Sequence, residues 1–135
     1  MMHLPVMRKL CLTASALLVL ASPAVALDAR LKAGLLKLDP DTRLEQRCDA
    51  EALERIARDA NPYKPDRVVA YAIKTPTLQG DAIESPGAAF RAKGRWYRLS
   101  YTCRTAHDRM KVLSFSYKIG ERISEDDWPK YNLWR

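Results

Sequence analysis

The chain is organised around Gly94-Arg-Trp-Tyr-Arg-Leu-Ser-Tyr-Thr-Cys103, which is its clearest β-strand. Side chains alternate there with the period of two that places successive residues on opposite faces of a sheet. The face predicted to line a core carries Tyr97, Leu99, Tyr101 and Cys103. The opposite face carries Trp96, Arg98, Ser100 and Thr102. The strand can therefore have a neighbour on each side, and its last residue offers a covalent link to another part of the chain.

The residues around this strand predict its two neighbours. Lys93-Gly94 suits a two-residue hairpin turn, because Gly94 tolerates a positive φ, and the turn would place Phe90 opposite Tyr97 and Ala88 opposite Leu99. A loop over residues 105–109 would connect to a third strand. The pairs expected there are Tyr101 with Leu113, Leu99 with Phe115, and Tyr97 with Tyr117. Both registers place apolar residues on one face, and a slip of one residue would expose them, so we predict a three-stranded antiparallel meander.

Helical segments are predicted before the sheet. Leucines recur at helical spacing in residues 28–38, which predicts a short amphipathic helix. Asp39 and Pro40 then suit the N-cap and first turn of a second helix, which carries Cys48. Asp49 is interpreted as the cap of a further helix over residues 50–59. The buried stripe of that helix is expected to contain Leu53, Ile56, Ala57 and Ala60.

The remaining segments complete the predicted fold. Residues 67–74 are apolar on both faces and predict an inner strand, and Leu78 and Ile83 are assigned to short strands, although the sequence does not settle the path over residues 75–86. Ser124 and the acids after it resemble a helix start. The tail ends in residues too apolar to be free, so they are expected to fold back over the sheet: Trp128, Tyr131, Leu133 and Trp134. The predicted class is α+β, with N-terminal helices packed on an antiparallel meander of four to five strands.

The first 26 residues have the pattern of a secretory signal peptide. Arg8 and Lys9 precede an apolar run over residues 10–21, and small residues lead to a cleavage site after Ala26. The alternative, a membrane anchor, would need about 20 apolar residues. Residues 27–135 then form a single domain with no membrane span, which we expect in the periplasm or outside the cell.

The cysteine count predicts one disulfide. Cys11 would leave with the signal peptide, so that Cys48 and Cys103 reach an oxidising compartment as a pair. The alternative is two free thiols or a metal site, but no second Cys or His lies at ligand spacing from either residue. We therefore expect neither a metal nor a cofactor.

Four motifs carry a family resemblance: residues 39–49, 67–71, 94–103 and 115–120. With them the chain resembles the family catalogued as domain of unknown function 930, from about Leu38 to Trp134. The resemblance implies a small exported protein of the alphaproteobacterial type. It brings no activity and no catalytic residues.

Catalytic constellations are sparse in the sequence. His107 and Asp108 could orient a base for Ser114 or Ser116, but neither serine lies on a nucleophile elbow, and the loop is predicted to be exposed. Asp81 and Glu84 could in principle contribute to glycosidase chemistry. The acids at residues 125–127 suit either a cation or, more simply, the start of a helix. A small periplasmic hydrolase is therefore kept as the alternative, and no catalytic residue is assigned.

The outer face of the predicted meander is the candidate binding surface. The two registers place Arg91 and Lys118 opposite Trp96, with Arg98 one pair further along. An aromatic ring bordered by cations could bind an anionic or sugar-containing ligand, or it could be a cation–π ladder or a patch covered by the tail.

The charge of the chain limits the choice of partner. Loss of Arg8 and Lys9 would lower the formal net charge from +7 to +5, with both signs interspersed, and export argues against nucleic acid. We therefore expect an exported, non-enzymatic protein that binds an anionic envelope component or a partner protein.

Overall fold

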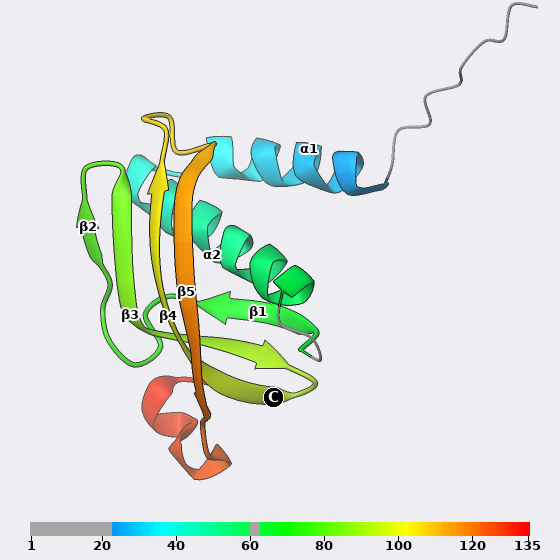
Figure 1. Ribbon diagram of the computed structural model, residues 1–135, viewed down its shortest axis with the longest axis vertical. Helices are drawn as coiled ribbons and strands as arrows, with labels where there is room; N and C mark the ends of the chain where they lie inside the picture. Colours follow the sequence, from blue (N-terminus) through cyan, green and yellow to red (C-terminus); the bar gives the residue numbers. More distant parts are fainter. Residues whose placement is uncertain (1–22, 60–62) are drawn as a thin grey trace, which may run out of the picture.

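The computed structural model describes residues 23–59 and 63–135, in which the second of two helices lies against one face of an antiparallel sheet and the first helix packs against the second (Figure 1). The predicted signal peptide lies outside the described residues except for its last four, which begin the first helix. The elements are α1 (Pro23–Leu36), α2 (Pro40–Asp59), β1 (Pro65–Val69), β2 (Thr77–Gln79), β3 (Ala82–Ala92), β4 (Arg95–Thr105), β5 (Val112–Arg122), and the 3₁₀ turns η1 (Glu125–Asp127) and η2 (Pro129–Tyr131). The predicted fold class is confirmed.

The five strands of the described chain form one sheet. Four of them lie in the order β1-β3-β4-β5, and β2 pairs with β3 outside this order. Both β1 and β2 pair with β3, β1 near its C-terminal end and β2 near its N-terminal end. Strand β4 is flanked along its length by β3 and β5. It is therefore the central strand that its alternation predicted.

The predicted β3–β4 hairpin is confirmed residue by residue. Phe90 pairs with Tyr97, and Ala88 with Leu99. Lys93 and Gly94 both have positive φ, at 52° and 72°. A two-residue turn of this kind matches the right-handed twist of the flanking strands, and it fixes their register.

The predicted β4–β5 register is wrong by four residues. Tyr101 pairs with Tyr117 and Leu99 with Ile119, instead of Leu113 and Phe115. The reason is a longer connection, because β4 continues to Thr105 and β5 begins only at Val112. Because the observed register differs from the predicted one by an even number of residues, Phe115 and Tyr117 still lie on the predicted inner face. Leu113, by contrast, is exposed.

Helix α2 is continuous, so the prediction of a second cap at Asp49 is wrong. Asp39 does cap α2, and it accepts a hydrogen bond of 3.1 Å from the backbone N–H of Thr42. Asp49 is instead buried in the middle of the helix, where the hydroxyl of Tyr101 donates to its carboxylate. Asp usually disfavours a helix interior because its carboxylate can hydrogen bond to nearby backbone groups. The carboxylate of Asp49 bonds to Tyr101 on the sheet instead, so it does not compete with the helical hydrogen bonds.

Strand β1 lies at an edge and ends at Val69, so the inner strand predicted over residues 67–74 is also wrong. Both faces of this segment are apolar for another reason. Val68 and Ala70 pack into the main core, whereas Val69 and Ile73 pack against the C-terminal tail.

Two apolar clusters stabilise the described fold, one on each face of the sheet. The main core lies between α2 and the inner face, and its disulfide joins Cys48 of α2 to Cys103 of β4 with Cα atoms 6.1 Å apart. The predicted disulfide is therefore confirmed. The smaller core lies on the outer face beneath the tail, with Trp96, Trp128 and Leu133 at its centre. The tail folds back as predicted, although the side chain of Ser124 makes no capping hydrogen bond.

Candidate functional site

The predicted binding surface around Trp96 is not at the surface. The Trp96 side chain is fully buried beneath the tail, and its indole N–H donates a hydrogen bond of 2.7 Å to the carbonyl of Trp134. Arg91 lies 5.8 Å from the centre of the Trp96 ring, but its guanidinium also donates to both carboxylate oxygens of Asp66 at 2.9 Å. Lys118 is paired with Ser100 rather than with Trp96. The alternative of a patch covered by the tail is the correct one.

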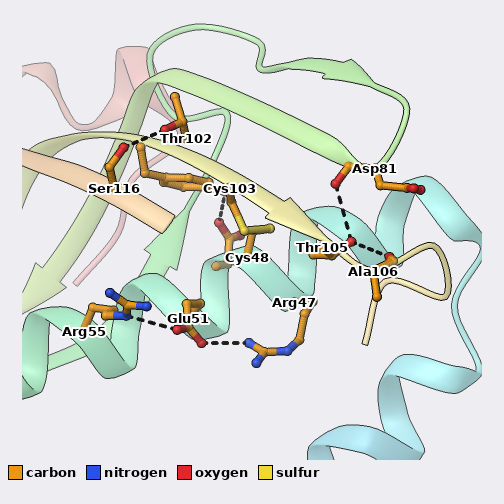
Figure 2. The surroundings of a disulfide bond; sticks show 12 residues. Arg47, Cys48, Glu51, Arg55, Asp81, Thr102, Cys103, Thr105, Ala106 and Ser116 are labelled. Atoms are coloured by element: carbon orange, nitrogen blue, oxygen red, sulfur yellow. Dashed lines mark hydrogen bonds and ion pairs between the residues drawn. A yellow bond between two sulfur atoms is a disulfide. The ribbon is translucent and has the colours of Figure 1, made fainter. Parts of the chain in front are cut away.

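The rest of the outer face is exposed and polar. Its side chains alternate with those of the main core and are mostly short hydroxyls. Thr102 of β4 and Ser116 of β5 lie across from each other with their hydroxyl oxygens 2.7 Å apart. Figure 2 shows both on the opposite side of β4 from the Cys48–Cys103 link to α2. This part of the sheet is therefore a polar surface that the described chain leaves open to a ligand.

Three cations surround one hollow on this face, which we call the cationic hollow. It has a volume of about 200 Å³. Lys74 comes from the turn after β1, Arg98 from β4 and Lys118 from β5. Its other lining residues are Ile73, Pro86, Gly87, Ala88, Leu99, Ser100 and Gly120. None of the described residues that line it carries a negative charge.

Two irregularities in strand pairing shape the cationic hollow. On β3, Pro86 and Gly87 together stand opposite the single residue Ser100. On β5, residues 120–121 together stand opposite Arg98. Such two-against-one pairings bend a strand and redirect its side chains. Because the two lie on opposite sides of β4 at nearly the same level, the hollow forms where the regular sheet surface is interrupted.

Glycines at these two irregularities allow the cations to come close. A Cβ on Gly87 would lie 2.6 Å from Cβ of Lys74, and the carbonyl of Gly87 accepts a hydrogen bond of 2.7 Å from the N–H of Ile73. A Cβ on Gly120 would lie 3.0 Å from Cβ of Arg98. Any larger residue would displace Lys74 or Arg98, so the two glycines have a direct role in placing the charges.

The cations of this hollow lack the carboxylate partners that others have. Within residues 23–59 and 63–135, no carboxylate oxygen lies within 4.0 Å of the charged groups of Lys74, Arg98 or Lys118. Arg47 and Arg55, by contrast, both bind Glu51 (Figure 2). The hollow therefore has a net positive charge that nothing in the described chain neutralises.

A second hollow adjoins the first, and we call it the hydroxyl hollow. It has a volume of about 390 Å³ and shares Pro86, Ser100 and Lys118 with the cationic hollow. Its polar rim contains Glu84, Thr102 and Ser116. The two hollows together present positive charge at one end and hydroxyl groups with a single carboxylate at the other.

The residues considered for hydrolase chemistry do not assemble as the sequence suggested. The side chain of His107 is 95% exposed, and its Nδ1 lies 3.3 Å from Asp81 rather than bonding to Asp108. Asp108 instead accepts from the backbone N–H of Met110. Neither Ser114 nor Ser116 hydrogen bonds to His107 within the described residues. In the same part of the chain no group of three His, Cys, Asp or Glu residues lies close enough to hold a metal.

A buried polar cluster was missed by the sequence analysis. Asp49 accepts a hydrogen bond of 2.7 Å from the hydroxyl of Tyr101, while the hydroxyl of Ser85 donates to the carbonyl of Ala70 close by. Burial raises the pKa of Asp49 to about 8, and the charge of Glu45 adds to this, whereas hydrogen bonds from Tyr101 and the Ala70 backbone oppose it. Burial also raises the pKa of Tyr101. The sequence does carry a signal for the burial of Asp49, because this residue lies three and seven residues before Ala52 and Ile56, which are buried on the same helix.

Comparison with known proteins gives one match. The family model described as Domain of Unknown Function (DUF930) matches residues 35–133. No curated protein and no solved structure matches the chain. Among the described helices, none combines the length and apolar character needed to cross a bilayer.

Proposed function

The chain belongs to the DUF930 family, and since that family is defined without a function, we propose one from the geometry of the outer face. The protein is an exported, non-enzymatic binding protein. Its ligand is an anionic component of the cell envelope, and the ligand binds at the cationic hollow and the hydroxyl hollow next to it.

The observation that carries this proposal is the set of three cations without counter-charges around one exposed hollow. Like charges that line one small hollow repel one another. A ligand that brings negative charge removes this repulsion and gains charge-assisted hydrogen bonds, which are the stronger kind. The arrangement therefore favours an anion over a neutral or cationic ligand.

Two further features support the exported location. The Cys48–Cys103 disulfide is of the kind that persists in oxidising compartments. The N-terminal residues have the charge and hydropathy pattern of a signal peptide. Export would bring the outer face of the sheet into contact with envelope components.

The test is retention on isolated envelope fractions. Protein expressed from the full sequence is purified and sedimented with envelope membranes. A triple variant, Lys74→Gln, Arg98→Gln and Lys118→Gln, removes the charge of the cationic hollow. The matched control, Lys37→Gln, Lys64→Gln and Lys111→Gln, removes the same charge from exposed positions elsewhere. We expect the first variant to lose most of its retention and the control to keep it. Equal retention of both variants would contradict the proposal.

The hydrolase alternative has a simple check. His107→Ala removes the only imidazole after residue 26 and leaves the outer face intact. We expect unchanged retention and an unchanged melting temperature. A variant that folds normally but no longer complements a deletion strain would favour the hydrolase instead.

A further inference from the structure

We propose that the ligand is a phosphorylated sugar, with its phosphate in the cationic hollow and its sugar ring in the hydroxyl hollow. This inference rests on the proposed function and specifies the ligand class for the same site.

The number and origin of the cations favour a phosphate monoester. A phosphate monoester carries between about 1.5 and 2 negative charges at neutral pH and three strong acceptor oxygens. Lys74, Arg98 and Lys118 line the hollow from three separate segments, so they approach a bound phosphate from different sides. The guanidinium of Arg98 lies 6.0 Å from the centre of the Tyr131 ring, and it turns from the tail toward the phosphate when the ligand binds. A carboxylate brings a single negative charge, so it offsets less of the charge of the three cations than a phosphate monoester does.

The size of the cationic hollow also limits what it binds. Its volume of about 200 Å³ is below the 300 to 1,000 Å³ typical of sites that enclose a whole small molecule. It therefore suits a charged group and its attachment point. The remainder of the ligand must extend along the outer face, where the hydroxyl hollow continues from the shared residues Ser100 and Lys118.

The chemistry of the hydroxyl hollow fits a polyhydroxylated ring. Thr102 and Ser116 share one hydrogen bond, so together they keep one hydroxyl proton to donate and lone pairs to accept, and Glu84 offers a carboxylate that accepts from ligand hydroxyls. Residues two apart on one face of a strand are about 7 Å apart, so Ser100 and Thr102 span the width of one sugar ring.

The two ends of this surface differ in charge, which sets the orientation of the ligand. Among the described residues that line the hydroxyl hollow, Glu84 is the only acid, and it would repel a phosphate placed there. The phosphate is therefore directed to Lys74, Arg98 and Lys118. The same carboxylate disfavours ligands with a phosphate at each end.

The first experiment measures binding by calorimetry with defined probes. The probes are glucose phosphorylated on its primary hydroxyl, glucose, glucuronate and inorganic phosphate. We expect the phosphorylated sugar to bind at least tenfold more tightly than inorganic phosphate or glucuronate, and glucose alone to show no binding. A sugar phosphate no tighter than inorganic phosphate would overturn the role of the hydroxyl hollow, and a tighter glucuronate would overturn the choice of phosphate.

Variants separate the two hollows. Arg98→Gln should weaken the phosphorylated sugar and inorganic phosphate alike, by about tenfold or more. Thr102→Val with Ser116→Ala should weaken the phosphorylated sugar alone. Arg58→Gln is the control, because Arg58 is exposed on α2, which packs on the other face of the sheet. Unchanged binding by folded Arg98→Gln would overturn the proposal.

The source of the phosphorylated sugar is determined with vesicles. Phosphatidylcholine vesicles with and without phosphatidylinositol monophosphate present a phosphorylated ring on a lipid. Binding that the free phosphorylated sugar displaces supports a lipid headgroup as the source, whereas calorimetric binding without vesicle binding supports a free sugar phosphate. If no phosphorylated sugar binds while envelope retention still depends on the three cations, this inference is wrong and the proposed function stands.

Discussion

The hydroxyl of Tyr101 donates a hydrogen bond of 2.7 Å to the carboxylate of Asp49, inside the main core. Asp49 directly follows Cys48 on α2, and Tyr101 lies two residues before Cys103 on β4. The central strand and the helix are thus joined by a covalent bond and by a buried polar contact next to it. Both contacts hold strand β4, which also presents Arg98 on its other face.

Stability should fall as pH rises because of Asp49. Its pKa is about 8 in the folded protein and near 3.8 when unfolded, so the folded state binds the proton more tightly. The stabilisation from this group is complete below about pH 4 and is lost as pH rises toward 8, at about 1.4 kcal/mol per pH unit. Urea unfolding at several pH values measures this slope. Asp49→Asn should remove it, and equal slopes for the two proteins would contradict the assignment.

Tyr101→Phe should destabilise the fold by about 1 to 3 kcal/mol, because it leaves a buried acceptor without its donor. The hydrogen bond from Tyr101 lowers the pKa of Asp49, so its loss should also raise that pKa further. Denaturant unfolding at pH 7 measures the first effect. Tyr97→Phe is the matched control, since no hydrogen bond to the Tyr97 hydroxyl is found in the described chain. A loss no larger than that of the control would show that the bond contributes little.

Removal of the disulfide should cost about 4 kcal/mol. Cys48 and Cys103 are separated by 55 residues, and the loss of chain entropy from closing a loop of that length is about this large. Unfolding of the Cys48→Ala, Cys103→Ala variant, compared with the wild type before and after reduction, measures the effect. If the reduced wild type and the variant match the oxidised protein, the disulfide does not stabilise the fold.

Trp96→Ala should act on stability and not directly on ligand binding. Trp96 is fully buried, and replacing a buried Trp by Ala typically costs about 3 to 5 kcal/mol. Trp96→Phe keeps most of the apolar contact and should remain folded. We expect Trp96→Phe to retain envelope binding, as measured by sedimentation. If this folded variant loses binding, the ligand binds at the tail-covered end of the sheet and not at the cationic hollow.

Gly120→Ala should weaken ligand binding with little loss of stability. The new methyl group would lie 3.0 Å from Cβ of Arg98, so Arg98 must move by a few tenths of an ångström from its place beside the cationic hollow. Calorimetry with the phosphorylated sugar should show a loss of several-fold. Gly34→Ala is the control, because a Cβ there meets nothing within 4 Å. Binding that is unchanged in Gly120→Ala would mean that the position of Arg98 is not important.

Local features of the sequence were sufficient for part of the fold. The Lys93-Gly94 turn and the alternation around it predicted the β3–β4 register, because a two-residue turn allows one pairing and one face must be buried. The parity of the cysteines after residue 26 predicted the disulfide. Of the candidate binding residues, Arg98 and Lys118 do lie together, since both project from the outer face of neighbouring strands.

Other features depended on contacts between distant segments. The β4–β5 register depends on a loop whose length the sequence does not mark, and the helical Asp49 depends on Tyr101, 52 residues away. Lys74 joins the site only through the close approach of its backbone to Gly87. The periodicity of a sequence predicts which residues share a face, but only the packing of the chain decides which segment covers that face. The tail covers Trp96 and its Tyr131 ring lies 6.0 Å from the guanidinium of Arg98, whereas Ser100 and Thr102 lie beyond the tail, so the candidate site moves along β4.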